Sequence, residues 1–203
     1  MQPCTFWARF AALALSTLLG ASAWAQADEA RAKKIVGGVC FMCHGAEGES
    51  SSETFPRLAG QHWEYTARQL DNFKSGKRKS TAMADMVAKL TPDEMVALGK
   101  FFESKAAPSE PPKDAGLAAV GQSIYHNGNK LSGLPACASC HGAAATGSAL
   151  LPRLAGQSSA YTETQLKQFN QRKRSNDNAV MQAIASQMSP LEMAAVAEYL
   201  SGK

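Results

Sequence analysis

One stretch of this chain occurs twice. Residues 152–175 agree with residues 56–79 at 13 of 24 positions, and the six residues from Pro56 to Gln61 recur letter for letter from position 152. A repeat of this length in a chain of 203 residues indicates that one structural unit was duplicated. The chain is therefore expected to fold as two similar halves.

Each half carries one Cys-x-x-Cys-His pentapeptide, and the two copies begin 97 positions apart. This spacing is the attachment signature of c-type haem. On a helical turn, each cysteine can form a thioether with one haem vinyl group, and the histidine then lies under the iron as a ligand. The sequence predicts two covalently bound haem c groups, attached at Cys40, Cys43, Cys137 and Cys140, with iron ligands His44 and His141.

A disulfide or a structural zinc site also uses Cys-x-x-Cys pairs. A zinc site would take the four sulfur atoms together and leave both motif histidines without a role. The fifth cysteine, Cys4, lies in the N-terminal stretch, which has the pattern of a signal peptide.

Residues 1–25 contain Arg9, an apolar run over 10–20 and the small-x-small ending Ala23-Trp24-Ala25. This pattern predicts a signal peptide cleaved after Ala25. A membrane anchor is the competing interpretation, but the apolar run is short for a span. Export predicts a periplasmic protein, in keeping with haem attachment on the far side of the bacterial membrane.

Cleavage leaves about 178 residues, enough for one ordinary domain or two small ones. Without Arg9 the mature chain has 20 basic and 17 acidic side chains, a net charge of +3. Four haem propionates nearly cancel this charge, so nothing indicates nucleic-acid binding. No second apolar stretch could cross a membrane, and we expect at most peripheral membrane association.

The segment that connects the two halves is rich in proline. Residues 106–114 include three prolines and no apolar periodicity, which predicts a stiff extended linker. It separates an N-terminal domain (26–105) from a C-terminal domain (115–203). Helical composition and spacing predict helices over residues 28–42, 62–75, 92–104, 116–127, 158–171 and 190–201. No segment alternates like a strand, so the expected fold class is all-α.

The second axial ligand is expected to be methionine, since the remaining histidines, His62 and His126, fall at unmatched positions and are interpreted as surface residues. The duplication matches two methionine pairs. Met95 and Met193 lie at helical spacing among apolar residues, which favours core packing. Met83 and Met181 follow a basic loop, in an irregular stretch before a helical segment, and are the predicted ligands. Met86 and Met188 have no methionine at the matching position of the other half.

Over the whole mature chain, the sequence resembles the cytochrome c4 family of periplasmic dihaem cytochromes. The resemblance rests on both Cys-x-x-Cys-His motifs, both Pro-x-Leu-Ala-Gly-Gln segments, the Tyr-Thr, Gln-Leu and Phe positions of the following helices, and both methionines. It implies two tandem class I cytochrome c domains packed pseudosymmetrically, with haem propionates near the domain interface. It also implies that a proline carbonyl orients each ligand histidine, which here assigns Pro56 and Pro152.

Further expectations concern the residues around the haems. Arg57, Arg153, Gln61 and Gln157 could hydrogen-bond propionates. The basic runs over 74–79 and 172–174 are either solvated surfaces or docking sites for acidic partners. Three glutamates between positions 47 and 53 have no charged counterparts over 142–151, so we expect the N-terminal haem to have the lower potential.

Histidine–methionine ligation leaves no vacant iron position for a substrate. The sequence therefore predicts an electron carrier rather than an enzyme. It is expected to shuttle electrons between redox proteins of the respiratory chain, from a quinol-oxidising complex toward a terminal oxidase. Two alternatives are a dihaem peroxidase, which is usually a much longer chain, and a cytochrome subunit of a sulfide- or alcohol-oxidising dehydrogenase.

Overall fold

The computed structural model describes residue 26 and residues 28–203, so the predicted signal peptide lies outside the described residues. Within the described part the chain is helical, and its only ladder contact is an isolated bridge between Asn129 and Leu134. The predicted all-α fold class is confirmed. No helix among the described residues is long and apolar enough to cross a membrane.

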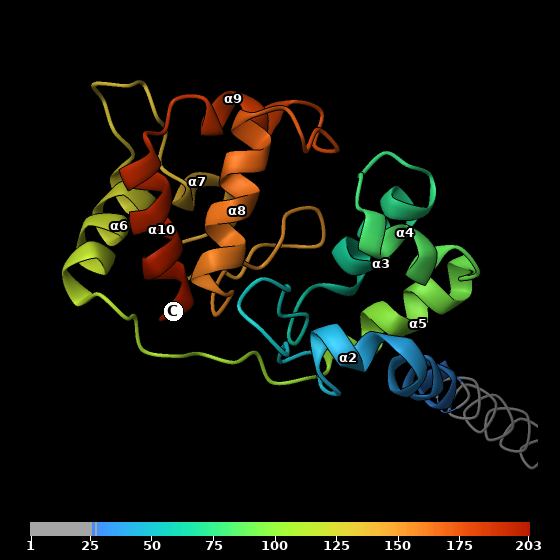
Figure 1. Ribbon diagram of the computed structural model, residues 1–203. Helices are drawn as coiled ribbons and strands as arrows, with labels where there is room; N and C mark the ends of the chain where they lie inside the picture. The colour runs from blue at the N-terminus through green and yellow to red at the C-terminus, as the bar shows by residue number, and fades with distance from the viewer. Residues whose placement is uncertain (1–25, 27) are drawn as a thin grey trace, which may run out of the picture.

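The two halves repeat one series of helices (Figure 1). Residues 28–35 are helical and lead directly into the first motif. The first half then contains a π-helix, η1 (Val36–Cys40), and the α-helices α2 (Phe41–His44), α3 (Trp63–Lys74), α4 (Thr81–Val87) and α5 (Pro92–Glu103). The second half contains α6 (Ala115–Asn127), α7 (Ala138–His141), α8 (Ser159–Asn170), α9 (Val180–Ala185) and α10 (Pro190–Ser201).

Matching capping boxes begin the last helix of each half. The Thr91 hydroxyl accepts from the backbone N–H of Glu94 at 3.2 Å, and the Glu94 carboxylate accepts from the N–H of Thr91 at 2.9 Å. Ser189 and Glu192 make the same two hydrogen bonds at the start of α10. Each box satisfies two N–H groups that have no partner inside the helix, so the local sequence fixes where these helices begin.

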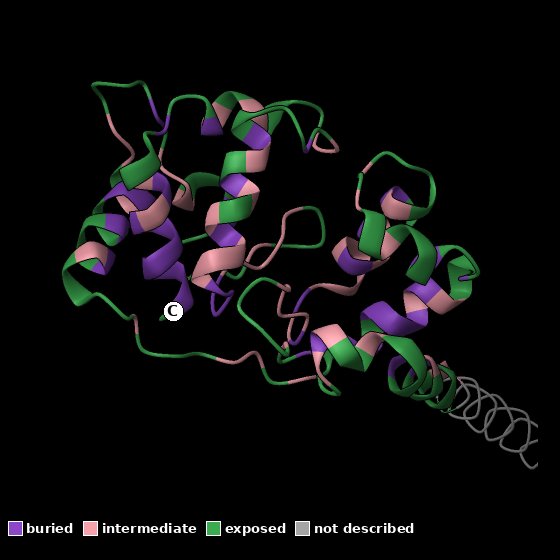
Figure 2. Ribbon diagram, in the orientation of Figure 1, coloured by how far each residue is buried: buried purple, intermediate pink, exposed green. Residues whose placement is uncertain are grey.

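Each half has its own apolar core, and α5 and α10 each carry more buried residues than any other helix of their half (Figure 2). Met95 is 4% exposed and Met193 is 2% exposed, which confirms that this methionine pair belongs to the cores. Met188 is also buried, in the position that Leu90 takes in the first half. Burial of these apolar side chains is the main favourable contribution to folding in each half.

The first and last helices of the second half cross at close range. A Cβ added to Gly121 of α6 would lie 1.9 Å from the carbonyl oxygen of Ala195 in α10. Only a residue without a side chain permits this approach. The crossing brings the segment that leads to the second haem motif against the helix that closes the domain.

The stretch that joins α5 to α6 runs along one edge of both halves in Figure 1. Glu198, buried in α10, accepts hydrogen bonds from the backbone N–H groups of Lys113 and Asp114 and from the hydroxyl of Ser159. The Lys113 ammonium forms an ion pair with Glu53 of the first half. The end of this stretch is therefore tied to both halves.

Candidate haem sites

The first Cys-x-x-Cys-His motif spans the end of one helix and the whole of the next. Cys40 is the last residue of η1, while Cys43 and His44 lie in α2. Both cysteines are half-buried, and the imidazole of His44 is buried at 8% exposure. One continuous helical path thus places both sulfur atoms within one turn of the histidine.

The second motif repeats this arrangement. Cys137 is the N-cap of α7, which contains Cys140 and ends at His141. Cys137 is half-buried, Cys140 is exposed and His141 is 7% exposed. The two motifs therefore present the same donor types, on the same element, in both halves.

A proline carbonyl faces each motif histidine. His44 Nδ1 lies 3.0 Å from the carbonyl oxygen of Pro56, and His141 Nδ1 lies 3.2 Å from that of Pro152. A carbonyl only accepts, so Nδ1 must carry the proton in both rings. Burial lowers the pKa of both histidines, against the smaller opposing effect of these hydrogen bonds. Each imidazole is therefore neutral, with the Nε2 lone pair available to a metal.

No disulfide joins the four motif cysteines to one another. Burial raises the pKa of the Cys40 thiol and raises that of Cys137 to about 11. Zinc is bound by thiolates, so a raised thiol pKa works against a zinc site. Among the described residues, no three His, Cys, Asp or Glu side chains come together as a metal site. The zinc interpretation thus has no structural support.

Met83 and Met181 lie in the first turns of α4 and α9, where the sequence analysis expected an irregular stretch. The Ser80 hydroxyl, at the N-cap of α4, accepts the N–H of Met83, and the Asp177 carboxylate, just before α9, accepts the N–H of Met181. Both methionines are half-buried. Met83 packs against the core that Cys40 also contacts, and Met181 against the corresponding core of the second half.

The two remaining histidines are engaged with protein groups. His62 Nε2 lies 2.8 Å from the carbonyl oxygen of Thr146 in the other half, and His126 Nε2 lies 3.0 Å from the Tyr199 hydroxyl. Both are partly buried rather than fully on the surface as expected. Their different surroundings agree with the sequence, in which His62 and His126 do not align with each other in the duplication.

Several features fit a haem in each half. Thr66 and Thr162, a pair matched by the duplication, have buried hydroxyls with no hydrogen-bond partner among the described residues. A native protein rarely leaves such groups without a partner, and a polar cofactor would supply one. In the first half, an open hollow of about 500 Å³ is lined in part by Ser80, Thr81 and Ala84, which flank Met83. The donors, the orphan hydroxyls and this space suit a large, mostly apolar group with polar edges.

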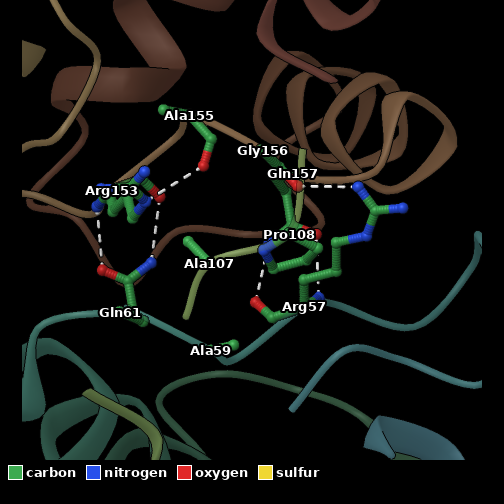
Figure 3. A pocket seen from close by; sticks show the side chains of 9 residues that line it. All are labelled: Arg57, Ala59, Gln61, Ala107, Pro108, Arg153, Ala155, Gly156 and Gln157. Atoms are coloured by element: carbon green, nitrogen blue, oxygen red, sulfur yellow. Dashed lines mark hydrogen bonds between the residues drawn. The ribbon is translucent and has the colours of Figure 1, made fainter. Parts of the chain in front are cut away.

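The repeated Pro-Arg-Leu-Ala-Gly-Gln segments meet each other between the halves (Figure 3). Gln61 hydrogen-bonds both backbone groups of Arg153, and Gln157 does the same with Arg57. The cavity left among these segments has a volume of only about 10 Å³, far too small for a cofactor. This region is a packed interface between the halves.

This interface changes the role expected for its arginines and glutamines. The Arg57 guanidinium donates to the Gly156 carbonyl at 2.8 Å and pairs with Glu110, while Arg153 Nε donates to the Ala155 carbonyl at 3.2 Å. The amides of both glutamines are taken by backbone. Arg57, Gln61 and Gln157 therefore hold the halves together, whereas the Arg153 side chain bonds within its own half. The exact repeat of this segment was the sequence signal that it pairs with its own copy.

Sequence reasoning also missed Tyr125 in α6. Its side chain is fully buried, and its hydroxyl donates to the carbonyl of Gly142, next to His141, at 2.7 Å. Burial strongly raises the pKa of this phenol, so it stays a neutral donor. Tyr125 has no counterpart in the repeat, so the duplication carried no signal for it.

Comparison with known proteins agrees with this geometry. A family model described as cytochrome c matches the chain twice, over residues 29–105 and 118–202. Cytochrome c4 of Thiocapsa roseopersicina is 41% identical over 182 residues, which cover 87% of this chain and 91% of that relative. The chain belongs to the cytochrome c4 family.

Other relatives support and extend this assignment. The crystal structure of reduced recombinant cytochrome c4 from Pseudomonas stutzeri superposes with a TM-score of 0.81 at 31% identity, covering 88% of this chain and 97% of that one. A protein of Thiomonas intermedia (strain K12) named thiosulfate dehydrogenase electron acceptor is 36% identical, over 94% of this chain and 90% of that relative. As a dihaem cytochrome of this family, the protein binds two covalent haem c groups and transfers electrons.

Proposed function

We propose that each half binds its haem through one shared scheme. Cys40, Cys43, Cys137 and Cys140 form the thioethers. His44 and Met83 are the axial ligands in the first half, and His141 and Met181 in the second. Support comes from the buried neutral imidazoles, whose Nδ1 atoms lie 3.0 and 3.2 Å from the Pro56 and Pro152 carbonyls. These prolines fix the ring tautomer and orientation.

We further propose that the protein is an electron shuttle without enzymatic activity of its own. A bound haem supplies a one-electron iron couple, and methionine ligation raises its potential relative to bis-histidine ligation. The observation that carries the proposal is the matched frame in both halves: a buried histidine oriented by a proline carbonyl and a half-buried methionine packed on the same core. In this scheme a histidine and a methionine would fill both axial positions of each iron, leaving none for a substrate.

Carbon monoxide tests this proposal directly. The reduced dihaem protein should keep its absorption spectrum under carbon monoxide, because both axial positions of each iron are taken. Methionine-to-alanine variants at 83 and 181 provide positive controls that should bind the gas. Ready binding by the unaltered protein would show an open iron and favour a catalytic role.

The proposed partners are redox proteins of the respiratory chain: a quinol-oxidising complex as electron donor and a terminal oxidase as electron acceptor. Reduction by the purified donor and oxidation by the oxidase, followed at the haem bands, test both steps. If electron transfer with these complexes is far slower than turnover of the whole respiratory chain, they are not the physiological partners.

A second candidate donor is a sulfur-compound dehydrogenase. The observation in its favour is the relative named thiosulfate dehydrogenase electron acceptor, which matches nearly the whole chain. Mixing the protein with a thiosulfate dehydrogenase and thiosulfate should then reduce both haems within catalytic turnover times. Copurification from the native host with either class of enzyme distinguishes a dehydrogenase partner from a general shuttle.

We propose that residues 1–25 are a signal peptide cleaved after Ala25 and that the mature protein is periplasmic. Residues 26–105 and 115–203 would be the two monohaem domains, joined by 106–114. Mass spectrometry of the native protein should find Gln26 at the N-terminus with two haem masses added. Limited proteolysis should cut first between 106 and 114.

A further inference from the structure

His62, at the N-cap of α3 in the first half, reaches the loop that follows the second haem motif (residues 142–151). Its Nε2 lies 2.8 Å from the carbonyl oxygen of Thr146. A carbonyl only accepts, so Nε2 carries the proton and donates it to this contact. The side chain makes no cap hydrogen bond to its own helix. His62 therefore directs its Nε2 donor at the other half rather than at α3.

The peptide group between Thr146 and Gly147 connects this contact to the second motif histidine. Its carbonyl accepts from His62, and its N–H, which belongs to Gly147, donates to the carbonyl of His141 at 3.0 Å. The two groups lie on opposite sides of one planar unit. Hydrogen bonds in such a chain polarise and strengthen one another. A side chain of the first half is thus two hydrogen bonds away from the backbone of His141.

Gly147 also lies against the carbonyl that faces the His141 ring. Its φ is +68°, in the left-handed region that favours glycine, and a Cβ there would lie 2.4 Å from the Pro152 carbonyl oxygen. The same oxygen lies 3.2 Å from His141 Nδ1. The peptide that His62 holds therefore contacts the backbone of His141 and packs against the group that orients its imidazole.

Arg68 of α3 holds the far end of the same loop. Its Nη2 donates to the Leu150 carbonyl at 2.7 Å, and its Nη1 lies 3.4 Å from the Ala149 carbonyl oxygen. The side chain of Leu150 is 76% exposed, and Thr146 and Ala149 are exposed as well. Because these side chains face water, the position of this part of the loop depends on its backbone contacts, and α3 of the first half supplies three of them.

The first half lacks the corresponding contact. Ser50, which matches Gly147 in the duplication, donates its N–H to the His44 carbonyl at 2.8 Å. The carbonyl of the same peptide belongs to Glu49, and among the described residues no hydrogen bond reaches it. The link from one half to the other half's motif histidine through this peptide therefore exists in one direction only.

We propose that His62 is a positioning residue for the second haem, which holds the axial ligand His141 through the Thr146–Gly147 peptide. The proposal rests on the ligand assignment given under the proposed function. Groups that orient a ligand imidazole also tune the metal that it binds. The electronic state of the second haem then depends on a side chain of the first half, whereas the first haem has no such dependence through the matching peptide.

Electron paramagnetic resonance of the fully oxidised dihaem protein tests the proposal. Each low-spin ferric haem gives its own signal, whose g-values follow the orientation of the axial ligands. Met181→Ala assigns the two signals, because it should change only that of the second haem. His62→Phe keeps a planar ring without a donor, and should shift the second-haem signal while leaving the first in place. His62→Gln offers an amide N–H near the position of Nε2 and should largely restore the original signal.

Two further variants separate this role from a general loosening of the contact between the halves. Ser158, which matches His62 in the duplication, donates its hydroxyl to the Glu53 carbonyl of the first half at 2.6 Å. That carbonyl lies outside the peptide that contacts His44, so Ser158→Ala should leave both signals in place. Arg68→Gln frees the outer end of the loop and should shift the second-haem signal less than His62→Phe does.

An unchanged second-haem signal in His62→Phe overturns the proposal, and so does an equal shift of both signals. It is also overturned if Arg68→Gln or Ser158→Ala shifts the second-haem signal as much as His62→Phe, since the Thr146–Gly147 peptide would then have no special role. If His62→Phe does not fold with both haems, His62→Asn stands in, because asparagine is a favoured N-cap residue with a shorter side chain. An unchanged second-haem signal in that variant is equally decisive against the proposal.

The methionine–iron absorption band reports ligation separately. If the unaltered protein lacks this band, the ligand assignment under the proposed function fails. If the band is present and His62→Phe has no effect on the second-haem signal, the ligand assignment stands and only the positioning role of His62 fails.

Discussion

Gln61 pairs with both backbone groups of Arg153: its Oε1 accepts from the Arg153 N–H at 2.8 Å, and its Nε2 donates to the Arg153 carbonyl at 3.0 Å. Gln157 makes the same two contacts with Arg57, at 2.9 Å each. An amide side chain thus takes the place that a neighbouring backbone would occupy in a sheet. The halves are joined by two copies of one contact.

Removing one of these amides should weaken the junction. Gln157→Ala leaves the N–H and C=O of Arg57 without partners in a partly buried interface, which costs about 1–3 kcal/mol. We expect a lower midpoint in denaturant unfolding of the dihaem protein and a separation of the two halves into distinct transitions. Gln187→Ala removes an exposed amide and should change stability by less than about 0.5 kcal/mol. Equal losses in the two variants would contradict the role of the interface amides.

Replacing Met181 and Met188 in turn should show which of them binds iron and which only packs in the core. Met181→Ala should abolish the methionine–iron absorption of the second haem while both haems stay attached through their cysteines. Met188→Leu should keep that band, because Met188 is buried at 6% exposure where the first half has Leu90. Loss of the band in Met188→Leu and its retention in Met181→Ala would reverse the assignment.

The capping box of α10 should make the second half sensitive to acid. Hydrogen bonds from the Asn129 amide and the Ser189 N–H lower the pKa of Glu192 from its usual 4.5. A carboxylate with a lowered pKa in the folded state adds stability above the unfolded-state pKa and loses it as the pH falls through the folded-state pKa. Glu192→Gln should therefore be less stable than the unaltered protein at neutral pH, and the two should converge below pH ~4.

Thermal unfolding across this pH range measures the effect. Glu163→Gln is the matched control, since Glu163 forms only a partly exposed pair with Lys167 one turn away on α8, and such pairs contribute about 0.3–0.5 kcal/mol. A stability difference for Glu192→Gln that stays constant from neutral to acid pH would argue against a protonation effect.

The structure also refines the expected difference between the haem potentials. Of the three glutamates after the first motif, Glu47 pairs with Lys105 and Glu53 with Lys113, while Glu49 forms no ion pair among the described residues. One uncompensated carboxylate at ~10 Å and an effective dielectric of ~60 lowers a potential by ~20 mV, and salt reduces this further. We expect the N-terminal haem to lie lower by about this amount.

A redox titration of Glu49→Gln tests this expectation. The lower potential should rise toward the higher one, which should stay nearly fixed. Asp93→Asn removes an exposed carboxylate at the start of α5 and should move neither potential by more than a small fraction of that shift. Movement of the higher potential alone would show that the N-terminal haem is not the lower one.

The features predicted correctly from the sequence are those set by neighbouring residues. The predicted helix over 190–201 matches α10, because proline at its first position and the Ser189–Glu192 box are signals contained within four residues. The hydrogen bonds from Arg78 to the Tyr161 hydroxyl and from Arg174 to the Tyr65 hydroxyl were not predictable in this way. These tyrosines lie in the other half, 83 and 109 positions away, and a basic run has the same composition whether its arginines face water or a tyrosine.

The proposed ligand methionines, Met83 and Met181, show the same division. Their place in the chain follows from the duplication, but the short helices that hold them do not. Ser80 and Asp177 accept the methionine N–H groups near the starts of these helices, and neither residue stands out in a sequence without its three-dimensional setting.

The symmetry of the amide contacts has a consequence for how such a chain can arise. Gln61 contacts Arg153, and the matching residue Gln157 contacts the matching residue Arg57. Such reciprocal contacts are those of a two-fold symmetric homodimer. A single half already carries both surfaces that this contact requires. The linker therefore adds no contact to the amide pairing and acts by raising the effective concentration of one half near the other. A single half on its own could make this contact only with a second copy, in a concentration-dependent way, whereas two halves in one chain make it within the molecule.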